Sequence, residues 1–210
     1  MDRGAPLSDA LHALIVLDRD GVLNDTVPNP AEPRPDSPLR LSEVSVFPWV
    51  PGVLRDLTKA GYGLVIASNQ PAAAKGKTTR QTLEAVHAEI LRQAQAEGGV
   101  ILSSHVCFHR SEDGCACRKP ATGLLVEAFA RHPRFRREVS WMAGDRATDV
   151  LAGAAFGLRT ALLTPEVDAV AERAALDAKS VRPSFSGNDL RDFGAYLLTS
   201  LNSSSRGPRG

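Results

Sequence analysis

The chain has 210 residues, of which 43% are hydrophobic and 23% are charged, a composition typical of a globular protein with its own core. Its 25 Lys and Arg residues nearly balance its 24 Asp and Glu residues, and the net charge of +1 argues against a general nucleic-acid binder or a polybasic membrane-surface protein. No segment is long and apolar enough to span a bilayer, and no signal-peptide pattern is present. We therefore expect a cytoplasmic protein without a nucleic-acid or membrane partner.

Apolar, β-rich runs alternate with helical patterns along the chain. Strands are predicted at residues 12–18, 63–68, 100–108, 139–144 and 160–164, and helices at 51–60, 79–96, 122–131, 147–156, 166–178 and 188–200. Most of the strands are continuously apolar, which is typical of a parallel sheet covered on both faces. The β-α-β-α order predicts a doubly wound, Rossmann-like parallel sheet in a three-layer α/β/α domain, with ligands at the carboxyl ends of the strands.

The spacing of these elements predicts one domain over residues 1–200, with no room for a large cap domain. Residues 28–38 contain five prolines, too many for a helix or central strand, so they predict an extended surface loop just after the first strand. The small, polar tail at 201–210 is expected to be disordered.

Two carboxylates follow the first predicted strand. Asp18 and Asp20 are two positions apart and therefore point roughly the same way, and Gly21 allows a sharp turn after them. A bare Asp-x-Asp is more often a turn with solvated acids. Close carboxylates that are not solvated are usually held by a cation or share a proton.

The ends of the other strands favour a functional site over a turn with solvated acids. Ser68 ends the second predicted strand, Lys119 lies beyond the third, and Asp145 and Asp149 follow the fourth. Each feature alone fits a turn or a helix start, but together they place acids, a hydroxyl and a cation at one crevice. Carboxylates of this kind suit Mg²⁺, and a lysine would neutralise a phosphoryl group. The set indicates phosphoryl transfer with a carboxylate nucleophile.

In this order and spacing, the four motifs Asp18-x-Asp20, Ser68, Lys119 and Asp145-x-x-x-Asp149 resemble those of the haloacid dehalogenase (HAD) superfamily of phosphatases. The resemblance covers residues 12 to 165. It implies that Asp18 attacks phosphorus, that Asp20 acts as general acid and base, and that Ser68 and Lys119 stabilise the phosphoryl group.

The same resemblance implies a Mg²⁺ site formed by Asp18, the Asp20 carbonyl and Asp145, with Asp149 supporting Lys119 or the metal shell. We also expect Asn69, Arg118 and Arg146 to contact the substrate. Arg118 would bind a phosphate that is not cleaved, a task suited to a planar cation with several donors.

All three cysteines of the chain lie in an eleven-residue window, residues 107–117. Cys107, His109, Cys115 and Cys117 supply three thiolates and one imidazole, which is a complete tetrahedral Zn²⁺ set and predicts a closed, structural site. Three free cysteines beside a surface histidine would be the plainer interpretation. The window from Cys107 to Lys119 is similar to the zinc loop of HAD phosphatases that act on heptose bisphosphate or histidinol phosphate.

The substrate remains open between these two small phosphorylated metabolites, and we favour D-glycero-D-manno-heptose 1,7-bisphosphate. Gly123 resembles the heptose enzymes, whereas Gly-Asp-Arg-Ala-Thr-Asp at 144–149 resembles the histidinol enzymes more closely. A phosphotransferase, and a non-catalytic binding protein that kept the pattern, are the alternatives. We expect a monomer, because no long apolar face is left unused.

Overall fold

The computed structural model describes residues 10–30 and 35–205, with residues 202–205 described by their backbone alone. Six parallel strands form one sheet in the order β3-β2-β1-β4-β5-β6. The strands are β1 (Leu14–Leu17), β2 (Gly63–Asn69), β3 (Ile101–Cys107), β4 (Trp141–Gly144), β5 (Arg159–Leu163) and β6 (Phe185–Gly187). The helices are α2 (Val50–Lys59), α3 (Arg80–Ala94), α4 (Gly123–Arg131), α5 (Ala147–Phe156), α6 (Glu166–Asp177) and α7 (Leu190–Ser205).

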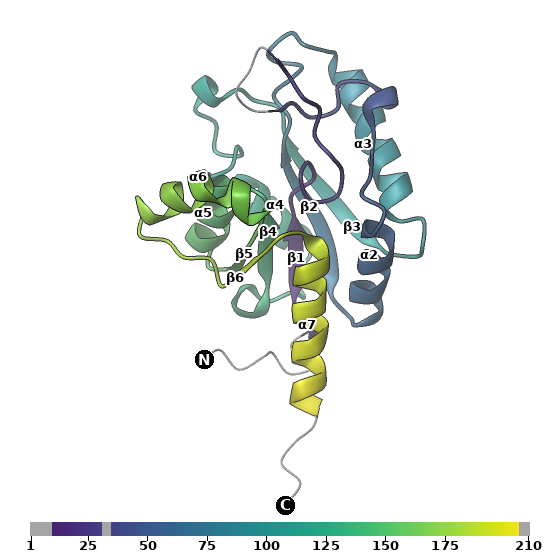
Figure 1. The fold of residues 1–210 in the computed structure, drawn as a ribbon, viewed down its shortest axis with the longest axis vertical. Coiled ribbons are helices and arrows are strands. Elements are labelled where there is room, and N and C mark those ends of the chain that lie inside the picture. Colours follow the sequence, from purple (N-terminus) through teal and green to yellow (C-terminus); the bar gives the residue numbers. More distant parts are fainter. Residues whose placement is uncertain (1–9, 31–34, 206–210) are drawn as a thin grey trace, which may run out of the picture.

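Helices cover both faces of the sheet (Figure 1). On one face, Ile15, Leu64 and Trp141 pack with buried residues of α2 and α7. On the other face, Val16 and Met142 pack with buried residues of α4 and α5. Successive side chains of each strand thus pack into the cores on opposite faces of the sheet, which explains the continuous apolar runs in the sequence. The predicted three-layer α/β/α architecture is confirmed.

Each predicted strand and helix is present, and most of their ends lie within two residues of the expected positions. β6 was not predicted, because it has three residues and pairs only with β5 at the edge of the sheet. The last helix is longer than expected: α7 continues to Ser205, and Leu201 is buried in the core. The tail predicted to start at residue 201 therefore begins as helix, and residues 206–210 lie outside the described part of the chain.

The proline-rich segment forms a loop after β1 without a helix or named strand in its described residues, and residues 31–34 lie outside them. A backbone pair between Val27 and Asp36 closes its base. Across the described ranges 10–30 and 35–205, no helix is long and apolar enough to cross a membrane.

The strand order reverses between β1 and β4, which lie side by side with their neighbours continuing in opposite directions. In open parallel sheets, ligands bind in the crevice beyond the carboxyl ends of the strands at such a reversal. Asp18 follows β1 and Asp145 follows β4, so the topology brings these two motifs to the same crevice.

Candidate active site

The turn after β1 presents Asp18 to a cleft of about 620 Å³. Oδ1 of Asp18 accepts the backbone N–H of Arg19 at 2.7 Å and lies 3.0 Å from Nζ of Lys119. Gly21 has a φ of +81°, and a Cβ there would collide with the carboxylate of Asp145. Glycine is thus required both for the turn and for the close approach of the β4 end.

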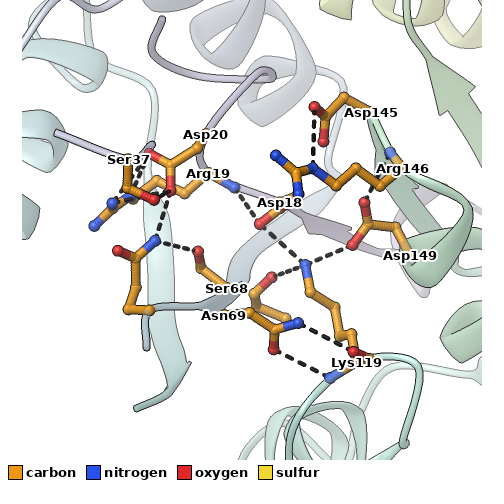
Figure 2. A network of polar contacts seen from close by, with 12 residues as sticks. Asp18, Arg19, Asp20, Ser37, Ser68, Asn69, Lys119, Asp145, Arg146 and Asp149 are labelled. Carbon is orange, nitrogen blue, oxygen red and sulfur yellow. Dashed lines mark hydrogen bonds and ion pairs between the residues drawn. The ribbon is translucent and has the colours of Figure 1, made fainter. Parts of the chain in front are cut away.

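Lys119 lies at the centre of the acidic motifs, as Figure 2 shows. Its Nζ lies 2.6 Å from Oδ1 of Asp149 and donates to the carbonyl oxygen of Ala67 at 2.6 Å. Burial alone would lower the pKa of Lys119, but Asp149 and Asp18 outweigh it and raise the pKa above its usual value. The side chain is therefore a fixed ammonium in a buried setting.

Asn69, at the end of β2, fixes the backbone of Lys119. Its Oδ1 accepts the Lys119 N–H at 3.1 Å, and its Nδ2 donates to the Lys119 carbonyl at 3.1 Å. Asn69 lines the cleft, as expected for a substrate contact, but both polar atoms of its amide are engaged in placing Lys119.

Three carboxylates, those of Asp18, Asp145 and Asp149, have ligand atoms within 4.8 Å of one another. Burial, and then repulsion by Asp18 and Asp149, raise the pKa of Asp145 well above its usual value. Burial also raises the pKa of Asp18 to about 6, with Lys119 opposing that shift. Oδ1 of Asp145 is buried and has no hydrogen-bond partner among the described residues. An unsatisfied acidic oxygen beside two more carboxylates fits a divalent cation such as Mg²⁺.

Asp20 lies in the same cleft but is surrounded by donors (Figure 2). Arg19 contacts both of its oxygens at 3.0 Å, and Ser37 donates to Oδ2 at 2.8 Å. Asn24 and Gln70 donate to the carboxylate at 2.9 Å and 2.6 Å. Burial by itself raises the pKa of Asp20, but Arg19 and the three hydrogen bonds outweigh it, so the pKa lies below its usual value.

The remaining predicted contacts line the cleft around this centre. Ser68 is buried at the end of β2. Arg118 lines the cleft while donating to the carbonyl of His109 at 3.2 Å. Arg146 precedes α5, and its Nε lies 3.8 Å from the carboxylate of Asp145. Asp149 caps the same helix by accepting the Arg146 N–H at 3.1 Å.

The cysteine cluster forms a compact set next to the cleft. The three sulfur atoms lie 3.1 to 3.6 Å apart, and Nδ1 of His109 lies 3.2 Å from Sγ of Cys117. A tetrahedron of thiolates around zinc has edges of roughly 3.8 Å, from Zn–S bonds of about 2.3 Å. No disulfide joins the cysteines, and burial together with the neighbouring thiols raises the pKa of Cys117 to about 12. A central cation would remove that penalty, so the donor set fits Zn²⁺.

Four side chains that hold Asp20 were absent from the sequence-based site: Arg19, Asn24, Ser37 and Gln70. Arg19 and Asn24 are fully buried polar residues of the Asp-Arg-Asp-Gly-Val-Leu-Asn stretch, and their closeness to Asp20 along the chain was the available signal. Ser37 lies in the proline-rich loop, and only the tertiary structure brings it to Asp20.

Comparisons with known proteins agree with this geometry. A family model described as HAD-hydrolase-like matches residues 116–193. A D-glycero-beta-D-manno-heptose-1,7-bisphosphate 7-phosphatase of Pseudomonas putida is 33% identical over 153 residues, covering 71% of this chain and 81% of that protein. The histidine biosynthesis bifunctional protein HisB of Legionella pneumophila is 33% identical over 136 residues, covering 65% of this chain but only 37% of HisB.

Among solved structures, the D,D-heptose 1,7-bisphosphate phosphatase of B. bronchiseptica, complexed with magnesium and phosphate, is similar with a TM-score of 0.74 and 29% identity. The alignment covers 89% of this chain and 98% of that one. The chain matches these relatives over most of its length and has the same kind of strand topology, and its four sequence motifs meet in one cleft. It therefore belongs to the HAD-like family of phosphatases and is itself a phosphatase.

Proposed function

We propose that the protein hydrolyses a phosphomonoester through an aspartyl-phosphate on Asp18. The observation that carries this proposal is the asymmetry of the Asp18 carboxylate. Oδ1 is held by the Arg19 N–H and by Lys119, at 2.7 and 3.0 Å, which leaves Oδ2 to attack. A carboxylate oriented by a fixed ammonium at the reversal point of the sheet is placed for in-line displacement.

In the first step, Oδ2 of Asp18 forms a bond to phosphorus as the ester bond breaks. The departing alkoxide takes a proton from Asp20, whose pKa is lowered in the free protein and is raised by the negative charge of the bound phosphate ester. In the second step, Asp20 accepts a proton from water, the water oxygen attacks phosphorus, and the Asp18 carboxylate is released with inorganic phosphate. Such proton transfers contribute about 10²- to 10⁴-fold to a rate. The hydroxyl of Ser68 and the ammonium of Lys119 stabilise charge on the phosphoryl oxygens.

Asp18 and Asp145, with the Asp20 carbonyl, would hold Mg²⁺, and Asp149 would support the site through Lys119. Bound Mg²⁺ supplies positive charge to the phosphoryl group and neutralises the acids around it. The buried, unpartnered Oδ1 of Asp145 supports this assignment. The sulfur and imidazole set of Cys107, His109, Cys115 and Cys117 would hold a structural Zn²⁺ that fixes the segment leading to Arg118 and Lys119.

We favour D-glycero-D-manno-heptose 1,7-bisphosphate as the substrate, with cleavage at the 7-phosphate. The cleft also has Lys75, Arg118 and Arg146 among its lining residues, and their positive charges suit the second phosphate of a bisphosphate. A relative with that named activity aligns over most of its length. Histidinol phosphate is the second candidate, because HisB proteins match at a comparable identity over a shorter stretch.

A phosphate-release assay with Mg²⁺ against the heptose bisphosphate and histidinol phosphate tests the proposal. We expect kcat/KM to be higher for the bisphosphate, and Arg118→Met to raise its KM about tenfold while changing the KM for histidinol phosphate much less. A clear preference for histidinol phosphate would overturn the substrate assignment. Incorporation of ¹⁸O from water into the released phosphate separates hydrolysis from transfer to another acceptor.

A further inference from the structure

Gln70 is a buried side chain placed between two elements of the site. It follows β2, and its backbone N–H donates to the carbonyl oxygen of Cys107 at 2.7 Å, which ties it to the end of β3. Only 1% of the residue is exposed. Its Nε2 donates to Oδ2 of Asp20 at 2.6 Å and to Oγ of Ser68 at 2.9 Å.

The orientation of this amide follows from its partners. An amide nitrogen carries two hydrogens, and the two acceptors Asp20 and Ser68 use both. Oε1 of Gln70 is buried and has no partner among the described residues. The reversed amide would place an oxygen 2.6 Å from a carboxylate oxygen, which repels it, so the orientation with Nε2 toward Asp20 is the stable one.

This orientation also fixes the direction of the hydrogen bond at Ser68. Because Oγ of Ser68 accepts from Gln70, the hydroxyl hydrogen of Ser68 is not used in that contact. It can be donated to a phosphoryl oxygen in the cleft. A hydroxyl that accepts one hydrogen bond donates a stronger one, because bonded chains polarise each other.

We propose that Gln70 is a positioning residue that links the general acid and base Asp20 to the phosphoryl-binding Ser68. One rigid amide sets the distance between the group that protonates the leaving oxygen and the group that binds the phosphoryl oxygens. The inference rests on the proposed function. Gln70 itself touches no reacting atom; it acts through the two residues that do.

The test compares two classes of ester. An aryl phosphate such as p-nitrophenyl phosphate has a leaving group that departs without a proton, whereas an alkyl phosphate such as the sugar ester needs one. Gln70→Met keeps the length of the side chain and removes both donors. We expect the ratio of kcat/KM for the alkyl ester to kcat/KM for the aryl ester to fall about tenfold. We compare kcat/KM because it reports the steps up to and including transfer of the phosphoryl group to Asp18.

Gln70→Glu keeps the shape of the side chain but replaces the donor with an acceptor facing Asp20, so we expect a fall in the ratio of kcat/KM values at least as large.

Gln93→Met is the matched control, because the Gln93 amide donates to Glu89 on the outside of α3 at 2.7 Å, away from the cleft. The control should leave the ratio unchanged. Thermal unfolding of each variant establishes that it is folded. Equal losses on both esters in folded Gln70→Met would show a general structural role and overturn the inference.

A second experiment measures binding and does not depend on catalytic activity. Binding of inorganic phosphate in the presence of Mg²⁺, measured by calorimetry, should weaken by about three- to tenfold in Gln70→Met, because Ser68 loses the bond that orients its hydroxyl. An unchanged Kd would overturn the inference. A wild-type protein that cleaves neither ester would overturn the proposed function and the inference with it, whereas an active wild type whose ester ratio is unchanged in Gln70→Met would overturn the inference alone.

Discussion

Nζ of Lys119 lies 2.6 Å from Oδ1 of Asp149, and both side chains are only 1% exposed. The two residues come from different segments: Lys119 follows the cysteine cluster, and Asp149 is in the first turn of α5. Their ion pair joins the loop after β3 to the helix after β4. The position of the Lys119 ammonium beside Asp18 is thus fixed by segments on two sides of the cleft.

Replacement of this partner by Asp149→Asn should cost both stability and rate. Lys119 would retain Asp18 but lose its closest counter-charge, and removal of one partner from a buried pair typically costs about 3 kcal/mol. We expect a lower free energy of unfolding in denaturant titrations and a kcat reduced by about tenfold or more. Glu89→Gln is a suitable control, because it weakens an exposed contact with Arg92 and should leave the free energy of unfolding nearly unchanged. An unchanged Asp149→Asn protein would contradict the role assigned to the pair.

The substitution Asp18→Asn should remove turnover and leave the fold intact. An amide is a poor nucleophile, and we expect kcat to fall by at least about 10³-fold. The loss of one charge from the crowded acids should also leave the melting temperature of the metal-free protein equal to or above that of the wild type. Steady-state kinetics and circular dichroism measure the two effects. Substantial residual activity would refute the assignment of Asp18 as nucleophile.

The crowded carboxylates predict a pH-dependent stability of the metal-free protein. The pKa of Asp18 is raised to about 6, mainly by burial, and the pKa of Asp145 is also raised well above its usual value by burial and by the neighbouring acids. A carboxyl with a raised pKa in the folded state stabilises the protein below its unfolded pKa, and the benefit is lost as the pH rises through the folded pKa. Stability should therefore fall from about pH 4 to beyond pH 6.

Mg²⁺ should reverse that loss, because it binds the ionised acids of the folded state. We expect the melting temperature to rise by several degrees with Mg²⁺ at pH 7.5 and by less at pH 5. Differential scanning fluorimetry with and without Mg²⁺ measures this, and Asp145→Asn should abolish most of the difference. An equal response to Mg²⁺ at both pH values would contradict a site built from Asp18 and Asp145.

The cysteine cluster predicts one zinc ion per chain. Elemental analysis of protein purified without chelators should find it, and Cys115→Ser should lower both the zinc content and the melting temperature. Ser111→Ala, in the same loop but outside the donor set, is the control and should keep the metal. Activity should fall with zinc loss, since the loop leads directly to Lys119. Protein free of zinc that keeps full stability and activity would refute the structural site.

The sequence determined much of this protein by itself. Continuous apolar runs predicted the parallel sheet, because strands buried on both faces need apolar residues at every position. Asp18, Ser68, Lys119 and Asp145 were predicted to meet, because parallel strands end at one edge. The crowding of Cys107, Cys115 and Cys117 predicted the cluster, because local spacing alone brings those side chains together.

The tertiary structure decided what depends on contacts between distant segments. β6 is stabilised by pairing with β5 and by packing of Phe185 on Phe193 of α7, and α7 extends past residue 200 with Leu201 buried in the core. Ser37 and Gln70 reach Asp20 from the loop after β1 and from the end of β2. No local pattern marks such residues, because a single polar side chain acquires its role only from the partner that packing places within hydrogen-bonding distance.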